Sequence, residues 1–468
     1  MPADILRNFI GGEWVAAAAG AATREVRNPA TEQLLGHVPL GGEREVAAAV
    51  AAARAAFPAW RQVPPVERAR YLFAFKRLLD EHAEQLAEVV TREHGKTLAE
   101  ARGSVQRGIE CVEVACGAPS LMMGYALEDV ARGIDCEAVR QPLGVFACIA
   151  PFNFPAMVPL WFFPFAVACG NTFVCKPSEQ VPLSQQLIFE LAAQAGFPAG
   201  VLNLVHGGRE TVEAICAHPE IRGVSFVGSS PVAELVYRAA AMHGKRVQAL
   251  GGAKNFMVVM PDADRPKTVA ALAGSAFGCA GERCLAGSVV LAVGGSHEWL
   301  RTGLREAAQA VVVGDGTAPD VTMGPLVSKA HLERVRDYVE RGVAEGAELL
   351  VDGRAAQLPA RGWFLGPCLF DRVTREMVVA REEIFGPVLC LASVPDLDAA
   401  LAWIATHPLA NASSIFTDSG SAARRFKYEV EASMAAVNIG VPAPMSFFGF
   451  GGAKGSFFGD LKAHGREA

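Results

Sequence analysis

The stretch VFACIAPFNFP, residues 145–155, is a short apolar run that ends in two prolines around an asparagine. Three similar apolar runs follow, at 171–177, 201–205 and 223–227, and segments of helical periodicity separate them. Largely apolar strands that alternate with helices are typical of a parallel sheet covered on both faces. The pattern therefore predicts an α/β fold.

Polar residues directly after these runs are candidates for binding, because ligands of such sheets lie beyond the carboxyl ends of the strands. Those residues are Asn153, Lys176, Ser178, Glu179, Gly228 and Ser229. A lysine that donates and a carboxylate that accepts suit ribose hydroxyls, and the carboxylate disfavours a 2′-phosphate, which favours NAD over NADP. The alternative for Lys176 and Glu179 is a solvated ion pair.

The rest of the chain divides into further segments. A short hairpin with a Gly-Gly turn is expected at residues 8–14, and helices are expected over 43–61 and 64–112. A second α/β region begins near residue 251, with strands expected at 256–260, 288–293, 388–392 and 413–416. Residues 127–141 alternate poorly and are expected to form an arm outside both regions.

Cys284 and Asn153 are the candidate reactive groups. A cysteine beside Arg283 in a glycine-flanked turn can have a lowered pKa, because positive charge favours the thiolate; the alternative is a buried small hydrophobe. The amide of Asn153 can stabilise an oxyanion, or it can serve only as a turn residue that satisfies its own backbone.

Composition restricts the partners. The 468 residues carry a formal net charge of −6, so there is no basic surplus for a nucleic acid or an anionic membrane. We see neither a secretory signal nor an apolar run long enough to span a bilayer. The eleven cysteines show no CxxC pair and no zinc-ligand spacing, so we expect no metal, free thiols and a cytoplasmic location.

The motifs together resemble the aldehyde dehydrogenase superfamily over nearly the whole chain. The order is PFNFP (151–155), KPSE (176–179), FVGS (226–229), GERC (281–284) and EEIFGP (382–387). Longer stretches resemble its CoA-acylating branch, the methylmalonate-semialdehyde (malonate-semialdehyde) dehydrogenases, at 148–160, 205–208, 214–229, 243–249 and 252–255.

The resemblance implies a Rossmann-like NAD-binding domain, an α/β catalytic domain and a small β oligomerisation arm. The NAD-binding domain would span 1–118 and 142–250, and the catalytic domain 251–440. The arm would span 119–141, together with residues near the C-terminus. By the same resemblance, the segment 441–468 is expected to end where family members continue into a strand of the oligomerisation sheet. A homodimer or homotetramer is expected.

By the same resemblance, Cys284 is the nucleophile, and Asn153 with the Cys284 backbone N–H holds the oxyanion. Arg107 and Arg283 would grip a substrate carboxylate, for which an arginine pair is well suited. The residues implied in NAD binding are Phe152, Lys176, Glu179, Gly228, Ser229, Glu383 and Phe385. For Arg107 alone, the alternative is the solvated face of a helix.

Position 250 bears on the fate of the acyl group. Hydrolytic members of the superfamily carry a glutamate that activates water, and the corresponding residue here, aligned on Lys254, is Leu250. Leucine cannot act as a general base, so the acyl group is expected to pass to coenzyme A. The expected reaction converts malonate or methylmalonate semialdehyde into acetyl-CoA or propionyl-CoA with loss of CO2.

Two alternatives to this reaction are a hydrolytic aldehyde dehydrogenase that makes a free acid and a non-catalytic relative kept for binding.

Two residues depart from the usual pattern of the family. Glu282 replaces a glutamine and can pair with Arg283, and Cys279 precedes the nucleophile by five positions, where it is expected to be a packed small residue.

Overall fold

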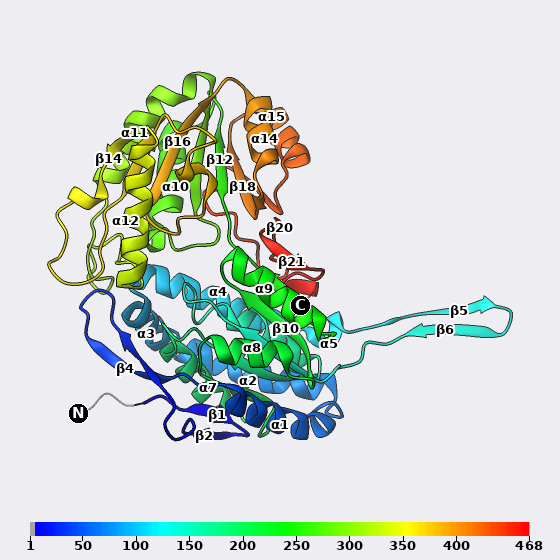
Figure 1. Ribbon diagram of the computed structural model, residues 1–468. Helices are drawn as coiled ribbons and strands as arrows, with labels where there is room; N and C mark the ends of the chain where they lie inside the picture. The colour runs from blue at the N-terminus through cyan, green and yellow to red at the C-terminus, as the bar shows by residue number, and fades with distance from the viewer. Residues whose placement is uncertain (1–4, 468) are drawn as a thin grey trace.

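The computed structural model describes residues 5–467, and over this range two large sheets form the framework (Figure 1). The first sheet is built from strands before residue 251 and one strand near the C-terminus, and the second from strands between residues 255 and 437. Each sheet is covered by helices, as the alternation of apolar runs and helical periodicity predicts.

The first sheet has the order β2-β1-β9-β8-β7-β10-β11-β21. Its five inner strands from β9 to β11 run parallel, while β1 and β21 pair antiparallel at its two sides. The bounds are β1 Asn8–Ile10, β2 Glu13–Val15, β7 Val145–Ile149, β8 Thr172–Lys176, β9 Leu202–Leu204, β10 Ile221–Val227, β11 Arg246–Leu250 and β21 Phe457–Gly459. The predicted hairpin and all four predicted strands are present; β11 was not anticipated.

Two helical layers enclose this sheet. One face packs against α1 Glu43–Trp60, α8 Arg209–Ala217 and α9 Ser230–Met242. The other face packs against α2 Pro65–Glu81, α3 Ala83–His94, α4 Leu98–Cys116, α6 Phe163–Ala168 and α7 Leu183–Gln194. The apolar residues of β7 and β8 face both layers in alternation, which explains why these strands are apolar throughout.

The second sheet has the order β14-β15-β16-β13-β12-β18-β19, and only the edge strand β14 is antiparallel. Its strands are β12 Asn255–Val259, β13 Gly287–Val293, β14 Glu348–Val351, β15 Cys368–Asp371, β16 Val388–Val394, β18 Ala412–Phe416 and β19 Met434–Val437. Its helices are α10 Arg265–Phe277, α11 His297–Gln309, α12 Lys329–Ala344, α13 Val378–Arg381, α14 Leu397–Thr406 and α15 Gly420–Glu429. The four strands expected here are found; β14, β15 and β19 had been missed.

A two-stranded hairpin of β5 Tyr125–Ala131 and β6 Ile134–Ala138 projects from the body beyond the short helix α5 Ala118–Leu121 (Figure 1). All residues of β5 are exposed, including Tyr125 at 81% and Leu127 at 65%. An apolar strand fully open to solvent is an unpartnered surface in a single chain.

The C-terminal segment forms one strand of a separate two-stranded sheet and then one strand of the first sheet. Strand β20, Ala453–Lys454, pairs with β17, Leu409–Ala410, and β21 then joins the first sheet beside β11. The helices of residues 5–467 include none both long and apolar enough to cross a membrane.

Candidate active site

Cys284 sits on a turn between the 3₁₀ segment Gly278–Gly281 and strand β13. Two buried amides hold its carbonyl: Asn255 Nδ2 donates to it at 2.9 Å and Asn411 Nδ2 at 3.0 Å. Asn255 Nδ2 also donates to the Ala286 carbonyl at 2.9 Å. Both asparagines belong to the second sheet region, and sequence reasoning gave neither a role. Their hydrogen bonds fix the turn that carries Cys284, residues 282–286, to that sheet. We call this segment the nucleophile turn.

Asn153 approaches the same turn from the first sheet, just after β7. Its Nδ2 donates to the Glu282 carbonyl at 3.0 Å, and its own backbone carbonyl accepts from Lys96 Nζ at 2.6 Å. Lys96 is 1% exposed and lies 3.9 Å from the centre of the Phe154 ring. Asn153 therefore lies against the turn that carries Cys284, and its role as an oxyanion donor stays a prediction. Lys96, which lies between α3 and α4, was not predicted to contact it.

The thiol of Cys284 is not activated in the way the neighbouring arginine suggested. Burial, followed by the charge of Glu383, raises its pKa to about 12. The backbone N–H groups of Cys284 and Leu285 act in the opposite direction, and Arg283 contributes still less. The expectation of a lowered pKa was wrong for this state of the protein, because desolvation of a thiolate outweighs one nearby charge.

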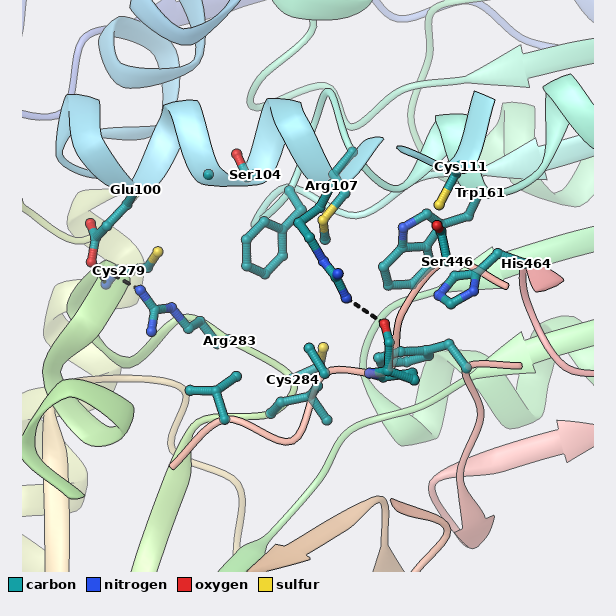
Figure 2. A pocket seen from close by; sticks show the side chains of 18 residues that line it. Glu100, Ser104, Arg107, Cys111, Trp161, Cys279, Arg283, Cys284, Ser446 and His464 are labelled. Atoms are coloured by element: carbon teal, nitrogen blue, oxygen red, sulfur yellow. Dashed lines mark hydrogen bonds and ion pairs between the residues drawn. The ribbon is translucent and has the colours of Figure 1, made fainter. Parts of the chain in front are cut away.

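Arg283 is engaged elsewhere. Its Nη2 lies 3.0 Å from Glu100 Oε1, and the Cys279 thiol contacts the same guanidinium. Figure 2 shows this guanidinium turned toward Glu100 and Cys279 and away from Cys284. Glu100 also caps α4 with Thr97 and accepts from the Cys279 N–H at 2.6 Å. The Thr97-to-Glu100 spacing is a capping-box signal that was present in the sequence.

Glu282 does not pair with Arg283, contrary to expectation. Its side chain is completely buried, where Oε1 accepts from the Val327 N–H at 3.2 Å. His94 and His331 approach its carboxyl oxygens at 3.7 and 3.5 Å. Burial raises the pKa of this carboxyl well above its ordinary value. The Glu282 carboxyl thus lies among Val327, His94 and His331, whereas the Arg283 guanidinium lies at Glu100.

The nucleophile opens into a cavity of about 280 Å³. Helix α4, the nucleophile turn and the loop after β19 line it (Figure 2). Arg107 and Arg283 both belong to this lining, so the structure brings the two predicted arginines together with Cys284. Arg107 donates to the Pro444 carbonyl and to Glu110 at 3.1 Å. Arg107 therefore faces the cavity, and the alternative interpretation, that it lies on a solvated face of the helix, does not describe its position.

A second group of residues lies at the carboxyl edge of the first sheet. Lys176 Nζ is 2.9 Å from Glu179 Oε2, and Arg24 is 3.7 Å from the other oxygen. Burial acts to raise the pKa of Glu179, but the Lys176 charge and hydrogen bond outweigh it and hold the pKa below its usual range. The carboxylate therefore stays ionised and can accept hydrogen bonds.

The start of α9 offers unpaired backbone donors. Ser229 is its N-cap residue, yet its side chain caps no N–H. The Gly228 N–H donates to the Leu250 carbonyl at 3.0 Å, so it is not available to a ligand. Free N–H groups at a helix N-terminus are suited to a phosphate. A glycine is needed at position 228 for packing, because a Cβ would meet the Phe226 ring at 2.5 Å.

Glu383 and Phe385 belong to the segment that follows α13. Glu383 Oε1 accepts from the Ala253 N–H at 2.7 Å, and burial raises its pKa to about 7. Phe385 has a left-handed backbone with φ of 61° and packs edge-on against Phe152 with ring centroids 5.7 Å apart. His331 Nε2 lies 2.7 Å from the Phe385 carbonyl and fixes that conformation.

Leu250 ends β11 and is 3% exposed. It belongs to the apolar cluster against which Cys284 packs, so an apolar side chain occupies the position that would hold a water-activating carboxylate. Within residues 5–467 no group of three or more histidine, cysteine or acidic residues is arranged to hold a metal ion.

Comparison with known proteins gives a consistent result. The model of the aldehyde dehydrogenase family matches residues 14–468. Malonate-semialdehyde dehydrogenase of Halalkalibacterium halodurans is 50% identical over 99% of this chain and 95% of its own length. Malonate-semialdehyde dehydrogenase 2 of Geobacillus thermodenitrificans is 52% identical over 99% and 96%.

Two solved structures are also similar over the full chain. A Sinorhizobium meliloti structure assigned as a methylmalonate-semialdehyde dehydrogenase and complexed with NAD has a TM-score of 0.98 and 43% identity, covering 100% of this chain and 95% of that one. The methylmalonate-semialdehyde dehydrogenase of Oceanimonas doudoroffii has a TM-score of 0.97 and 44% identity, covering 100% and 96%.

The raised pKa of Cys284 predicts how this thiol reacts in the protein alone. We expect its alkylation by iodoacetamide to accelerate steadily from about pH 7 to about pH 10 without a plateau, because the thiolate is the reactive form. Peptide mass spectrometry after brief labelling measures the rate at this residue, and Cys284→Ser gives the background. A plateau with a midpoint below about pH 8 would mean that the turn stabilises the thiolate.

Proposed function

The chain belongs to the aldehyde dehydrogenase family, and we propose that it oxidises malonate or methylmalonate semialdehyde with NAD and transfers the acyl group to coenzyme A with loss of CO2. The observation that carries this proposal is the cavity whose lining includes Cys284 and both arginines, Arg107 and Arg283. The names of the similar proteins point to the same substrates.

We assign NAD binding to the first sheet and its helices, residues 1–118 and 142–250, and the nucleophile to a catalytic unit of residues 251–440. The ionised Glu179 with Lys176 suits ribose hydroxyls, and the open start of α9 at Ser229 suits the pyrophosphate. Glu383, Phe385 and Phe152 would border the nicotinamide end, next to the thiol. Bound NAD would supply the acceptor for the hydride that leaves the substrate carbon.

The protein's own groups account for the first steps. Cys284 first loses its thiol proton to solvent, and the resulting thiolate attacks the aldehyde carbon and forms a thiohemiacetal. The Asn153 amide and the Cys284 backbone N–H would hold the oxyanion, since Asn153 follows β7 and its amide is held against the nucleophile turn by a hydrogen bond to the Glu282 carbonyl. Departure of the hydride leaves a thioester on Cys284.

The later steps follow from the chemistry of that thioester. Its carboxylate lies β to the thioester carbonyl, so the C–C bond can break with release of CO2 while the electron pair moves to an enolate oxygen. The same oxyanion donors stabilise that oxygen, and protonation at carbon gives an acetyl or propionyl thioester. The acyl group then passes to the CoA thiol. Leu250 offers no base to water, which disfavours hydrolysis at this stage.

The central prediction concerns turnover. With malonate or methylmalonate semialdehyde, we expect repeated NADH formation only when CoA is present, because the CoA thiol must remove the acyl group from Cys284 before the next cycle. Absorbance of NADH measures this, and mass spectrometry identifies acetyl-CoA or propionyl-CoA. Cys284→Ala should abolish NADH formation while NAD binding persists. Equal turnover without CoA would instead assign the protein to the hydrolytic enzymes, and cofactor binding with no turnover of any aldehyde would identify a non-catalytic relative.

A second prediction concerns the arginines. Arg107→Ala or Arg283→Ala should lower the selectivity for malonate semialdehyde over propanal about tenfold or more, since each removes charge-assisted hydrogen bonds to a carboxylate. The ratio of the two kcat/KM values is the measurement. Arg102→Ala is the matched control, because Arg102 is on the same helix but pairs with Glu84 in solvent. A selectivity that both site variants retain would rule out the carboxylate grip.

We also propose that the protein is a homodimer or homotetramer joined through the arm at 119–141, together with residues near the C-terminus. The exposed apolar side chains of Leu127 and Ile134 support this. Leu127→Asp combined with Ile134→Asp should lower the mass measured by light scattering after size-exclusion chromatography. Glu128→Gln on the same arm is the control, and an unchanged mass in the double variant would argue against this interface.

The cytoplasm is the proposed location, because all eleven cysteines are free and Cys284 must stay reduced to act. Cell fractionation checks this, and recovery of the protein outside the cytoplasm would contradict it.

A further inference from the structure

Glu100 on α4 lies beside the nucleophile turn, and the proposed function gives it no role. Its Oε2 accepts from the Thr97 N–H at 3.0 Å, which completes the capping box of the helix. Its Oε1 accepts from the Cys279 N–H at 2.6 Å and from Arg283 Nη2 at 3.0 Å. Helix capping accounts for only one of the two oxygens. The other oxygen binds the segment that leads to Cys284.

The segment that Glu100 contacts has an unusual backbone. Cys279 and Ala280 have φ of 50° and 51° with ψ of 37° and 30°, and Gly281 has φ of 74°. We call residues 279–281 the left-handed segment. Because the Cβ of an L-residue crowds its own backbone in this conformation, two such non-glycine residues in succession persist only where their surroundings hold them.

The surroundings of the left-handed segment connect it to the site. The Glu282 N–H donates to the Cys279 carbonyl at 2.9 Å, so the segment sets where the nucleophile turn begins. Gly281 packs closely against the Gly386 backbone, since a Cβ there would meet the Gly386 carbonyl oxygen at 2.1 Å. Glu100 links the segment to α4, the helix that forms one wall of the cavity.

Both oxygens of Glu100 are in use within the protein. Figure 2 shows the Glu100 carboxylate and the Arg283 guanidinium turned toward each other beside Cys279. The side chains of Glu100 and Arg283 are 15% and 18% exposed, so their contact is largely shielded from solvent. Glu100 is therefore placed to act on the reaction through the position of the nucleophile turn, and not through contact with substrate.

We propose that Glu100 is a positioning residue of the reaction, which holds the left-handed segment through the Cys279 N–H and thereby sets the place of Cys284 relative to α4. The assignment rests on the proposed function only in that Cys284 is the nucleophile. Loss of the Oε1 contact lets Cys279 and Ala280 relax toward a conformation that their Cβ atoms favour. The thiol then moves with the nucleophile turn, and a displacement of about 1 Å is enough to slow such a reaction markedly.

Kinetics with propanal, NAD and CoA test this role, because an aldehyde without a carboxylate does not depend on the arginines. Glu100→Ala should lower kcat about tenfold or more and change KM less than about twofold. Glu100→Gln should regain most of this loss, since its amide oxygen can still accept from the Cys279 N–H. Thr97→Ala is the matched control, because it removes the capping hydroxyl and leaves the Oε1 contacts.

Three outcomes of these kinetics would overturn the assignment. They are an equal kcat in wild type and Glu100→Ala, an equal loss in Thr97→Ala, and a Glu100→Gln variant as slow as Glu100→Ala.

Relief of the backbone strain gives a second test. Glycine adopts the left-handed conformation readily, so Ala280→Gly lessens the need for the Glu100 contact. We expect Glu100→Ala to lower kcat by a smaller factor in the Ala280→Gly background than in the wild type, which a double-mutant cycle measures. An equal or larger factor in that background would contradict the role of the left-handed segment.

A measurement without turnover keeps the test decisive. Thermal unfolding checks that each variant folds, and if Glu100→Ala does not, Glu100→Met replaces it with an unbranched side chain of similar length. Glu100→Ala should speed the alkylation of Cys284 by iodoacetamide at about pH 8 about threefold or more, because a turn that is no longer held loses part of the burial that raises the pKa of this thiol. An unchanged rate would count against the assignment.

The alkylation assay separates this role from the proposed function. Faster alkylation in Glu100→Ala but not in Thr97→Ala, in a protein that shows no CoA-dependent turnover, would sustain the positioning role and refute the proposed function. CoA-dependent turnover as proposed, with kcat and alkylation rate unchanged in Glu100→Ala, would refute the role of Glu100 alone.

Discussion

Hydrogen bonds from buried amides to the backbone of the nucleophile turn fix the geometry of the whole site. Asn255 and Asn411 hold the Cys284 carbonyl from the second sheet, while Asn153 holds the Glu282 carbonyl from the first. The turn is thus tied to both layers. Because buried carbonyls are costly to leave unpaired, these bonds keep the thiol in one position between the two sheets.

The burial of Cys284 determines the protonation state of its thiol. A sulfur packed against apolar residues, with Glu383 nearby, is held in its protonated form in the protein alone. Cys284 is partly buried and lines the cavity, so the choice between water and a thiol depends on which of them is activated. With Leu250 in place of a base, the site is better suited to transferring an acyl group to a thiol than to hydrolysis.

The charged groups around the cavity already have partners. Arg283 is paired with Glu100, and Arg107 with Glu110 and the Pro444 carbonyl. A substrate carboxylate therefore competes with internal acceptors for both guanidinium groups, and neither arginine acts as an isolated charge.

The sequence by itself determined the fold class, the order of the strands along the chain and the main chemical groups. Apolar runs such as 145–149 and 172–176 predict buried parallel strands because both of their faces must be covered. Local motifs likewise predict that Cys284 and Asn153 are the reactive groups and that Lys176 with Glu179 binds the adenine ribose. Edge strands such as β14 and β19 escaped prediction, because the apolar pattern of a short, partly covered strand is weak.

Only the tertiary structure decided which residues face each other across the sheets. Lys96 and Asn411 carry no local signal, since their partners are distant in the sequence. The raised pKa of Cys284 and the pairing of Arg283 with Glu100 could not be predicted from the sequence either. Desolvation and ion pairing depend on what surrounds a group in three dimensions, and spacing along the chain carries no record of it.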